Sequence, residues 1–158
     1  MSRRYWLFKS EPSAFSFEDL RRRPDGTEHW DGVRNFQARN TLRDEVRVGD
    51  GVLFYHSGIP EPVIVGMAEV VKAGYPDWTA WDPQGDRFDP RSTEAKPRWY
   101  MVDIRFVKAF PHPVTRSELK TIPELANMVL FRNSRLSVQP VREEEWRLLL
   151  RLGGAKEG

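Results

Sequence analysis

Two apolar segments separated by only five residues constrain the fold of this chain more than any other feature of its sequence. Residues 51–56 (GVLFYH) are rich in β-branched and aromatic side chains and predict a strand. Residues 62–71 (PVIVGMAEVV) predict a second strand, bent or bulged at Gly66. Because the linking residues 57–61 are few, we expect the two strands to form an antiparallel hairpin.

Shorter patterned segments surround this hairpin. Ser16 and Thr115 each stand three residues before an acidic side chain, which is the pattern of a capping box at the start of a helix. The remaining patterns predict strands at 5–8, 99–107 and 137–139, and helices at 16–23, 35–46, 123–128 and 143–152. No β–α–β rhythm is present, so we expect an α+β fold, a small mixed β-barrel flanked by short helices.

The length of the chain suits a single domain. A chain of 158 residues is long enough for one hydrophobic core, and a second independent core is not expected. We assign residues 1–152 to this domain and expect residues 153–158 to form a frayed tail.

Composition excludes several classes of site. The chain has no cysteine, which excludes disulfides, thiolate metal sites and a cysteine nucleophile. The three histidines are not paired at helical ligand spacing, so we expect no metal and no cofactor. The net charge is only +2, and only a local basic patch could bind nucleic acid. No apolar run is long enough for a signal peptide or a membrane span; we expect a cytoplasmic protein, or a nuclear one in a eukaryote.

Residues 30–40 (WDGVRNFQARN) form the most informative stretch for function. Asp31-Gly32 favours a tight turn, and Asn35 is a candidate N-cap for the helix that follows. Polar atoms of Arg34 and Asn35 would then lie at a loop–helix junction beside an exposed or half-exposed Trp30 ring. Such a junction can hold a flat, polar ligand, because it offers a ring for stacking, an amide for an edge and a cation for a phosphate.

A long irregular segment, residues 74–97, follows the hairpin. A loop of this length in a compact domain is usually functional or disordered, and its aromatic residues argue against disorder. Trp78 and Trp81 lie within it, where a large ring has no regular element to pack into. Either ring could therefore face Trp30 and clamp a flat base, although packing in the core is the more common role of a tryptophan.

The strongest predicted strand ends in Tyr55-His56-Ser57. Alternation along a strand places Tyr55 and Ser57 on one face and His56 on the other. This arrangement, and the lack of a G-x-S-x-G motif, argues against a Ser-His hydrolase. Tyr55 and Ser57 are instead candidate contacts with a base at a strand end, with a simple capped strand end as the alternative.

Two further segments carry candidate residues. Lys9, Ser10 and Glu11 follow the first strand, and Lys9 with Glu11 could form an acid–base couple or an exposed ion pair. Residues 132–140 (RNSRLSVQP) are mostly polar. Arg132 and Arg135 are candidate phosphate contacts, with Ser137 and Gln139 facing a pocket; a plain polar loop is the alternative.

Several of these motifs, taken in order, resemble the EVE domain. They are WLFKSEP (6–12), WDGVRN (30–35) with Ala38-Arg39, Gly49-Asp50, FYHS (54–57), VGMAEV (65–70) and RLSVQPV (135–141). The resemblance implies a PUA-like fold with a pocket for a modified base, and no established catalytic activity. Trp30, Asn35 and Ser57 match the pocket motifs of the family; Lys9, Ser10 and Arg34 lie in matching motifs.

The resemblance leads to a hypothesis of a non-enzymatic nucleic-acid-binding module. Its ligand would be nucleic acid carrying a methylated or hydroxymethylated cytosine or a methyladenine, held in an aromatic-lined pocket. One alternative is an amidohydrolase of modified nucleosides, like the ASCH domains, in which Lys9 and Glu11 would act. Another is a sensor of small molecules that never binds a polymer.

Overall fold

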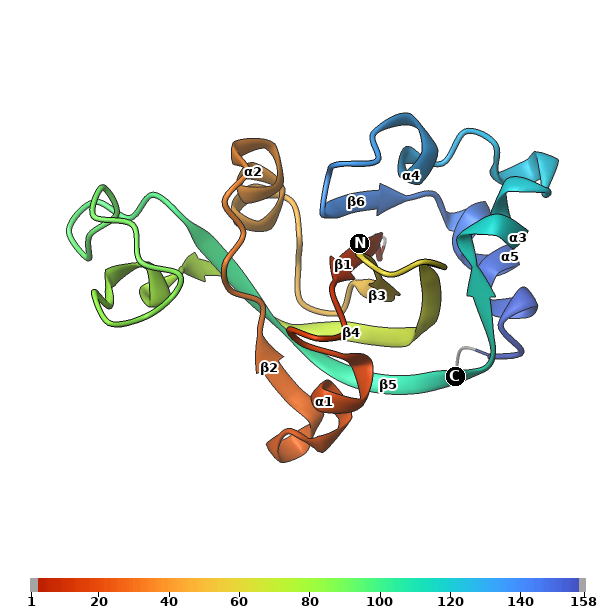
Figure 1. Cartoon of the computed structure of the whole chain (residues 1–158), viewed down its shortest axis with the longest axis horizontal. Coiled ribbons are helices and arrows are strands. Elements are labelled where there is room, and N and C mark those ends of the chain that lie inside the picture. Colours follow the sequence, from red (N-terminus) through yellow and green to blue (C-terminus); the bar gives the residue numbers. More distant parts are fainter. Residues whose placement is uncertain (1–2, 157–158) are drawn as a thin grey trace.

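The computed structural model describes residues 3–156 and contains one six-stranded mixed sheet (Figure 1). The strands lie in the order β2-β5-β4-β3-β1-β6. Their bounds are β1 Tyr5–Ser10, β2 Thr27–His29, β3 Gly51–His56, β4 Val63–Pro76, β5 Tyr100–Thr115 and β6 Val138–Val141. β1 runs parallel to β3, and every other neighbouring pair is antiparallel.

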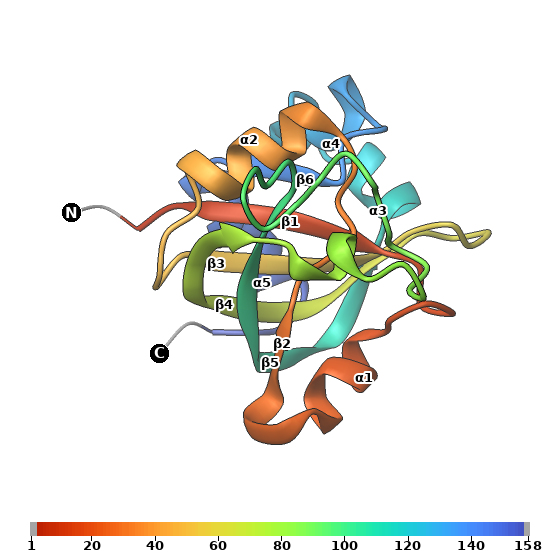
Figure 2. The same cartoon turned by 90° about the vertical axis from the view of Figure 1, so that its left-hand side faces the viewer.

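This sheet is mixed, as expected, but it does not close into a barrel. Its order begins at β2 and ends at β6, and these two strands are its edges rather than partners of each other. The predicted hairpin is confirmed as β3 and β4, which lie beside β1 in Figure 2. The expectation of a barrel is therefore corrected to an open, curved sheet flanked by short helices, within a single α+β domain.

Short helices connect the strands. The α-helices are α1 Phe17–Arg22, α2 Phe36–Asp44, α3 Arg116–Lys120, α4 Val129–Arg132 and α5 Glu143–Leu152, and the 3₁₀ turns are η1 Pro24–Gly26, η2 Trp78–Trp81 and η3 Pro123–Leu125. The predicted caps are confirmed: Ser16 and Thr115 form capping boxes, and the Asn35 side chain accepts a bond from the Ala38 N–H.

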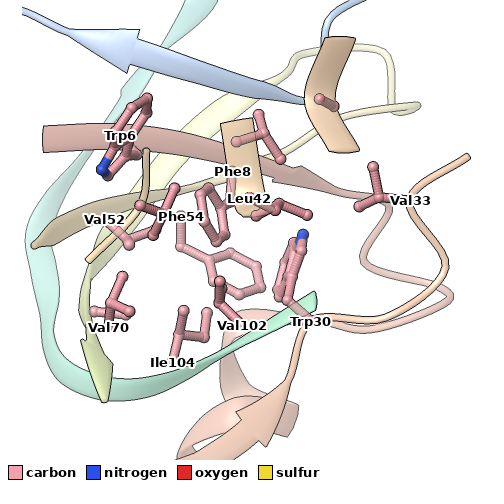
Figure 3. Packing of buried hydrophobic residues seen from close by; sticks show 14 of the residues in the cluster. Trp6, Phe8, Trp30, Val33, Leu42, Val52, Phe54, Val70, Val102 and Ile104 are labelled. Carbon is pink, nitrogen blue, oxygen red and sulfur yellow. The ribbon is translucent and has the colours of Figure 1, made fainter. Parts of the chain in front are cut away.

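Hydrophobic residues pack on both faces of the sheet. Trp6 and Phe8 point from β1 to one face, where α1 and α2 supply Leu20 and Leu42. The residue between them, Leu7, points to the other face and joins a second cluster built by α3, α4 and α5. A strand buried on both faces is apolar at every position, which explains the unbroken run from Trp6 to Phe8. Figure 3 shows part of the first cluster.

Gly66 marks the bend predicted in β4. The register of β4 shifts beside it against both neighbouring strands. A Cβ atom at this position would lie 2.3 Å from the Phe17 ring and 2.6 Å from the Lys108 carbonyl. The glycine therefore allows α1 and β5 to approach the bend closely.

Several predicted bounds differ from the structure. The helix expected at 123–128 is only the 3₁₀ turn η3, Pro123–Leu125, and α4 begins later, at Val129. The strand expected at 99–107 continues to Thr115. The tail expected from residue 153 is ordered at its start, because Ala155 is buried and the Gly153 carbonyl accepts a bond from the His112 N–H. Residues 157 and 158 lie outside the described residues. Within residues 3–156, no helix combines the length and apolar character needed to cross a lipid bilayer.

Candidate base-binding pocket

A pocket of about 480 Å³ opens where three strands of the sheet end. β1 contributes Lys9 and Ser10, the segment after β2 contributes residues 30–34, and Ser137 comes from just before β6. The other lining residues are Glu11, Ala14, Phe15, Arg23, Glu28, His29 and Arg87. Of the residues predicted from sequence, the pocket therefore unites Lys9, Ser10, Trp30, Arg34 and Ser137.

Trp30 forms an aromatic wall of this pocket and belongs to the core as well. Its ring centroid lies 5.3 Å from that of Phe8, 5.4 Å from that of Phe54 and 6.3 Å from that of Phe15. The side chain is only 7 % exposed, and Figure 3 shows it among the buried residues. The expectation of an exposed or half-exposed ring was therefore wrong, because three phenylalanines cover most of the indole surface.

Lys9 and Ser10 are fixed by backbone carbonyls. The Lys9 ammonium donates to the Ser134 carbonyl at 2.5 Å, and the Ser10 hydroxyl donates to the Phe15 carbonyl at 2.6 Å. Burial lowers the pKa of Lys9, and the nearby charge of Arg116 lowers it further. Lys9 and Glu11 both line the pocket, but the bond of Lys9 goes to Ser134.

Arg34 ties the pocket rim to the long loop. Its guanidinium donates to the Asp77 carboxylate at 3.1 Å and to the Arg87 carbonyl at 2.6 Å. Asp77 is fully buried and also accepts bonds from the Gly32 and Thr79 N–H groups, each at 2.9 Å. Because the fork of Arg34 is occupied in this way, its first role is to position the loop rather than to meet a phosphate.

The long loop is ordered by a second buried carboxylate. Asp89 accepts bonds from the Trp99 indole N–H at 2.7 Å and from the Arg91 N–H at 3.0 Å. These bonds, led by that of Trp99, lower the pKa of Asp89 to about 2. A carboxylate held by several donors in this way fixes the loop path at neutral pH. This role of Asp89 was not predicted, because its partners Arg91 and Trp99 are near in sequence but form no recognisable motif with it.

The two loop tryptophans do not complete a clamp around the pocket. Trp78 is 49 % exposed, and its ring lies 5.1 Å from the ring of His29, which does line the pocket. Trp81 is partly buried, and its indole nitrogen has no hydrogen-bond partner among the described residues. Neither ring contributes to the pocket lining, so the expected pairing of Trp30 with one of them is not present in this conformation.

Other predicted site residues lie elsewhere. The Asn35 amide oxygen is used as the helix cap. Tyr55 and Ser57 line a second pocket, which Lys9 also borders. Arg132 and Arg135 are exposed and line neither of these two pockets. Gln139 does not face the pocket, because it is buried and donates to the carbonyls of Asn133 and Leu136.

His56 has a structural role. The Phe17 N–H donates to its Nε2 atom at 3.1 Å, so the ring caps the start of α1. Burial lowers the pKa of His56, and the nearby Asp19 carboxylate partly opposes this shift. Because Nε2 accepts this bond, the His56 ring must be neutral. The next residue, Ser57, lines the second pocket.

The sequence missed several residues that line the pocket. Glu28 accepts bonds from the Arg23 guanidinium at 2.6 Å and lies 3.0 Å from the His29 ring nitrogen. By contrast, the carboxylate of Asp31 makes no hydrogen bond or ion pair within residues 3–156. Asp31 is therefore a free acceptor beside Trp30. Among the described residues, no group of three or more histidine or acidic side chains could hold a metal ion.

Comparison with known proteins identifies the family. The model of the EVE domain matches residues 4–152. Human thymocyte nuclear protein 1 is 42 % identical over 165 residues, which cover 94 % of this chain and 73 % of that protein. A hypothetical protein from Leishmania major has a solved structure with a TM-score of 0.91 and 48 % identity, covering 97 % of this chain and 96 % of the other.

One similar structure was solved with a ligand. The human THYN1 protein in complex with 5-methylcytosine-containing DNA gives a TM-score of 0.90 at 40 % identity, covering 98 % of this chain and 99 % of that chain. An ASCH protein from Zymomonas mobilis gives a TM-score of 0.55 at 15 % identity over 96 % of each chain, which shows likeness of fold alone. The open mixed sheet with its short helices is the PUA-like fold, and the chain belongs to the EVE domain family.

Proposed function

We propose that this protein is a non-enzymatic reader that binds nucleic acid through one modified base, with 5-methylcytosine as the first candidate. The observation that carries the proposal is the pocket beside Trp30, which combines an aromatic wall with charged and polar groups around it. The 5-methylcytosine DNA complex of the similar human protein supports this reading of the pocket. Such a protein would work in the cytoplasm of a bacterial cell or in the nucleus of a eukaryotic one.

The size of the pocket suits a single base. Its volume of about 480 Å³ lies within the range of small-molecule sites, which is about 300–1,000 Å³. Stacking of a base on an aromatic side chain contributes about 1–3 kcal/mol. This is of the same order as the few kcal/mol that extrusion of a base from a duplex costs. Because Trp30 is only 7 % exposed, its contribution lies at the low end of this range, and polar contacts with the base edge must offset the rest of the cost.

The Asp31 carboxylate can accept a hydrogen bond from the edge of the base. Its carboxylate is an acceptor without a partner in the described chain, and it lines the pocket next to Trp30. Carboxylates accept hydrogen bonds from the exocyclic amino group of cytosine. We infer that Asp31 favours bases with an amino group, cytosine or adenine, over thymine or uracil. Apolar burial of one methyl group then adds about 0.8 kcal/mol, or about a fourfold preference for the methylated base.

A substitution that fills the pocket beside Trp30 tests whether this pocket binds the modified base. Ala14 is exposed and lines the pocket, whereas its neighbour Ser13 is exposed and does not line it. Ala14→Phe should fill the pocket without removing any buried side chain, and Ser13→Phe adds the same bulk outside it. Competition binding with 5-methylcytosine and unmodified oligonucleotides should show a preference in the wild type and in Ser13→Phe that is lost in Ala14→Phe. An unchanged preference in Ala14→Phe would exclude this pocket.

The hydrogen bond made by Lys9 argues against the amidohydrolase alternative. Its ammonium already donates to the Ser134 carbonyl, although its lowered pKa is a property that a catalytic lysine also needs. Incubation with N4-acetylcytidine should therefore give no product. Turnover that is lost in Lys9→Ala would replace the reader by an enzyme. Tight binding of the free modified nucleoside without any binding of oligonucleotides would instead indicate a small-molecule sensor.

A further inference from the structure

A second pocket of about 290 Å³ lies beside the first, and Lys9 lines both of them. The remaining lining residues come from four segments: Tyr55 and Ser57, Pro62, Arg116, and Leu130 with Ser134. From the sequence, Tyr55 and Ser57 were expected to contact a base. In the structure they line this second pocket and not the first. The second pocket is therefore considered as a site of its own.

Two positive charges face this pocket without an acidic partner. Within residues 3–156, Lys9 bonds to the Ser134 carbonyl and the Arg116 guanidinium lies over the Phe131 ring, 5.3 Å from its centroid. Neither side chain forms an ion pair there. The charge of Arg116 contributes to the lowered pKa of Lys9, as expected for like charges that are close together. A bound anion would relieve this repulsion.

Glu61, whose charge acts on Tyr55, does not fill this role. Glu61 is exposed and accepts a bond from the Ser117 N–H, and it is not among the residues that line the pocket. The uncharged polar residues that line it are Tyr55, Ser57 and Ser134, each of which carries a hydroxyl, while Pro62 and Leu130 form an apolar wall. Two cations in a pocket with hydroxyl-bearing residues suit an anion with several oxygen acceptors.

We propose that this second pocket binds a backbone phosphate of the nucleic-acid strand that carries the modified base, with Arg116 as its direct contact. The proposal rests on the proposed function for the identity of the ligand. Phosphate matches the forked donors of an arginine. Lys9 borders both spaces, so a base in the first pocket and a phosphate in the second would lie on either side of a single side chain.

The test compares two cations on one helix. Arg116 and Lys120 both lie on α3, but only Arg116 lines the pocket. Arg116→Gln should reduce the slope of log K against log salt by about 0.9 for duplex DNA, the value of one phosphate contact. If wild type and variant bind equally at 1 M salt, this change in slope makes the variant bind about eightfold more weakly than the wild type at 0.1 M salt. Lys120→Gln should leave the slope unchanged, and Arg116→Lys should restore it.

Preference for the modified base separates this proposal from the proposed function. We expect Arg116→Gln to weaken binding of modified and unmodified oligonucleotides by the same factor. If the wild type shows a preference and Arg116→Gln matches Lys120→Gln in slope and affinity, the phosphate site is wrong and the reader stands. If Arg116→Gln removes the preference itself, Arg116 contacts the base and the phosphate assignment is overturned. If the wild type shows no preference but Arg116→Gln still lowers the slope, the phosphate site stands and the reader fails.

Discussion

Trp30 serves the hydrophobic core and the base pocket at the same time. Because Phe8, Phe15 and Phe54 surround its ring, removal of the ring creates a cavity as well as a loss of stacking. We expect Trp30→Ala to lower the free energy of unfolding by about 3–5 kcal/mol, as is usual for a large buried aromatic side chain. Urea denaturation at neutral pH measures this change.

An exposed tryptophan provides the control for this prediction. Trp78→Ala removes a ring that is 49 % exposed, and the expected loss of unfolding free energy is within about 0.5–1 kcal/mol. Equal urea midpoints for Trp30→Ala and the wild type would contradict the burial of the Trp30 ring. Loss of base preference in Trp30→Ala is informative only where the variant is folded, which is why the pocket itself is better tested at Ala14.

His56 couples the stability of α1 to pH. In the folded protein its pKa is lowered by burial, and its Nε2 atom accepts the Phe17 N–H, so the folded state resists protonation. The unfolded chain protonates this residue near pH 6.5, so the unfolded state binds more protons and stability falls as the pH decreases through about 6.5. We expect melting temperatures between pH 7.5 and 5.5 to fall less steeply in His56→Gln than in the wild type.

A second histidine provides the comparison. His112 is exposed and lines neither pocket, so His112→Gln controls for the removal of one histidine from the chain. Identical pH profiles for wild type and His56→Gln would mean that the contact with α1 does not depend on a neutral ring.

The segment between β4 and β5 is held to the body of the protein by buried carboxylates. Asp77 joins Gly32 and Arg34, on the pocket side, to the start of this loop. We expect Asp77→Ala to loosen the attachment on both sides, because the partly buried N–H groups of Gly32 and Thr79 lose their acceptor and Arg34 loses its ion pair. Hydrogen exchange should then accelerate at residues 31–34 and 77–81, with little change in the sheet.

Another aspartate in the same loop is a matched control. Asp82 is exposed and accepts a bond from the Gln84 N–H. Asp82→Ala should therefore leave exchange at residues 31–34 at the wild-type rate. Protection that is unchanged in Asp77→Ala would show that the loop is positioned without this carboxylate.

Elements defined by local signals were predictable from the sequence. The bounds of α5 agree with the prediction, and Asn35 marks the start of α2 through its capping side chain. The second half of β5 was missed, because Pro111 and Pro113 argue against a strand. These prolines lie where the register with β4 shifts, between the pairs Ile64–Val114 and Gly66–Ala109, so the ladder does not require their missing N–H groups.

Contacts between distant segments were not predictable in the same way. The parallel pairing of β1 with β3 depends on the whole arrangement of the chain, and no local motif encodes it. This pairing places Lys9 beside Tyr55 and leads to two pockets where the motifs suggested one. Arg87 and Arg116 were missed because nothing local ties them to a pocket: Arg87 lies in the long irregular loop, and Arg116 lies in a capping box that predicts only the start of a helix.

The charge of the whole molecule sets how its binding depends on salt. With a net charge of +2, general attraction to nucleic acid is weak, and the cations near the pockets dominate. Arg23 and Arg34 are paired with Glu28 and Asp77.

Three other cations line the pockets without an acidic partner. They are Lys9, Arg87 and Arg116, none of which forms an ion pair within residues 3–156. If each cation contacts a phosphate of its own, the slope of log K against log salt is about −2.7 for duplex DNA; it is shallower if Lys9 and Arg116 share the phosphate of the second pocket.

This slope also decides the role of the two arginines singled out by the sequence. Arg132 and Arg135 are exposed and outside both pockets, so the double substitution Arg132→Gln with Arg135→Gln should leave the wild-type slope unchanged. Titrations of wild type and variant between 50 and 200 mM salt (about 0.6 in log units) measure it. A wild-type slope steeper than about −4, reduced by the double substitution, would place both arginines on the phosphate backbone. The strand would then extend from the pockets over α4 towards β6, because Arg132 ends α4 and Arg135 precedes β6.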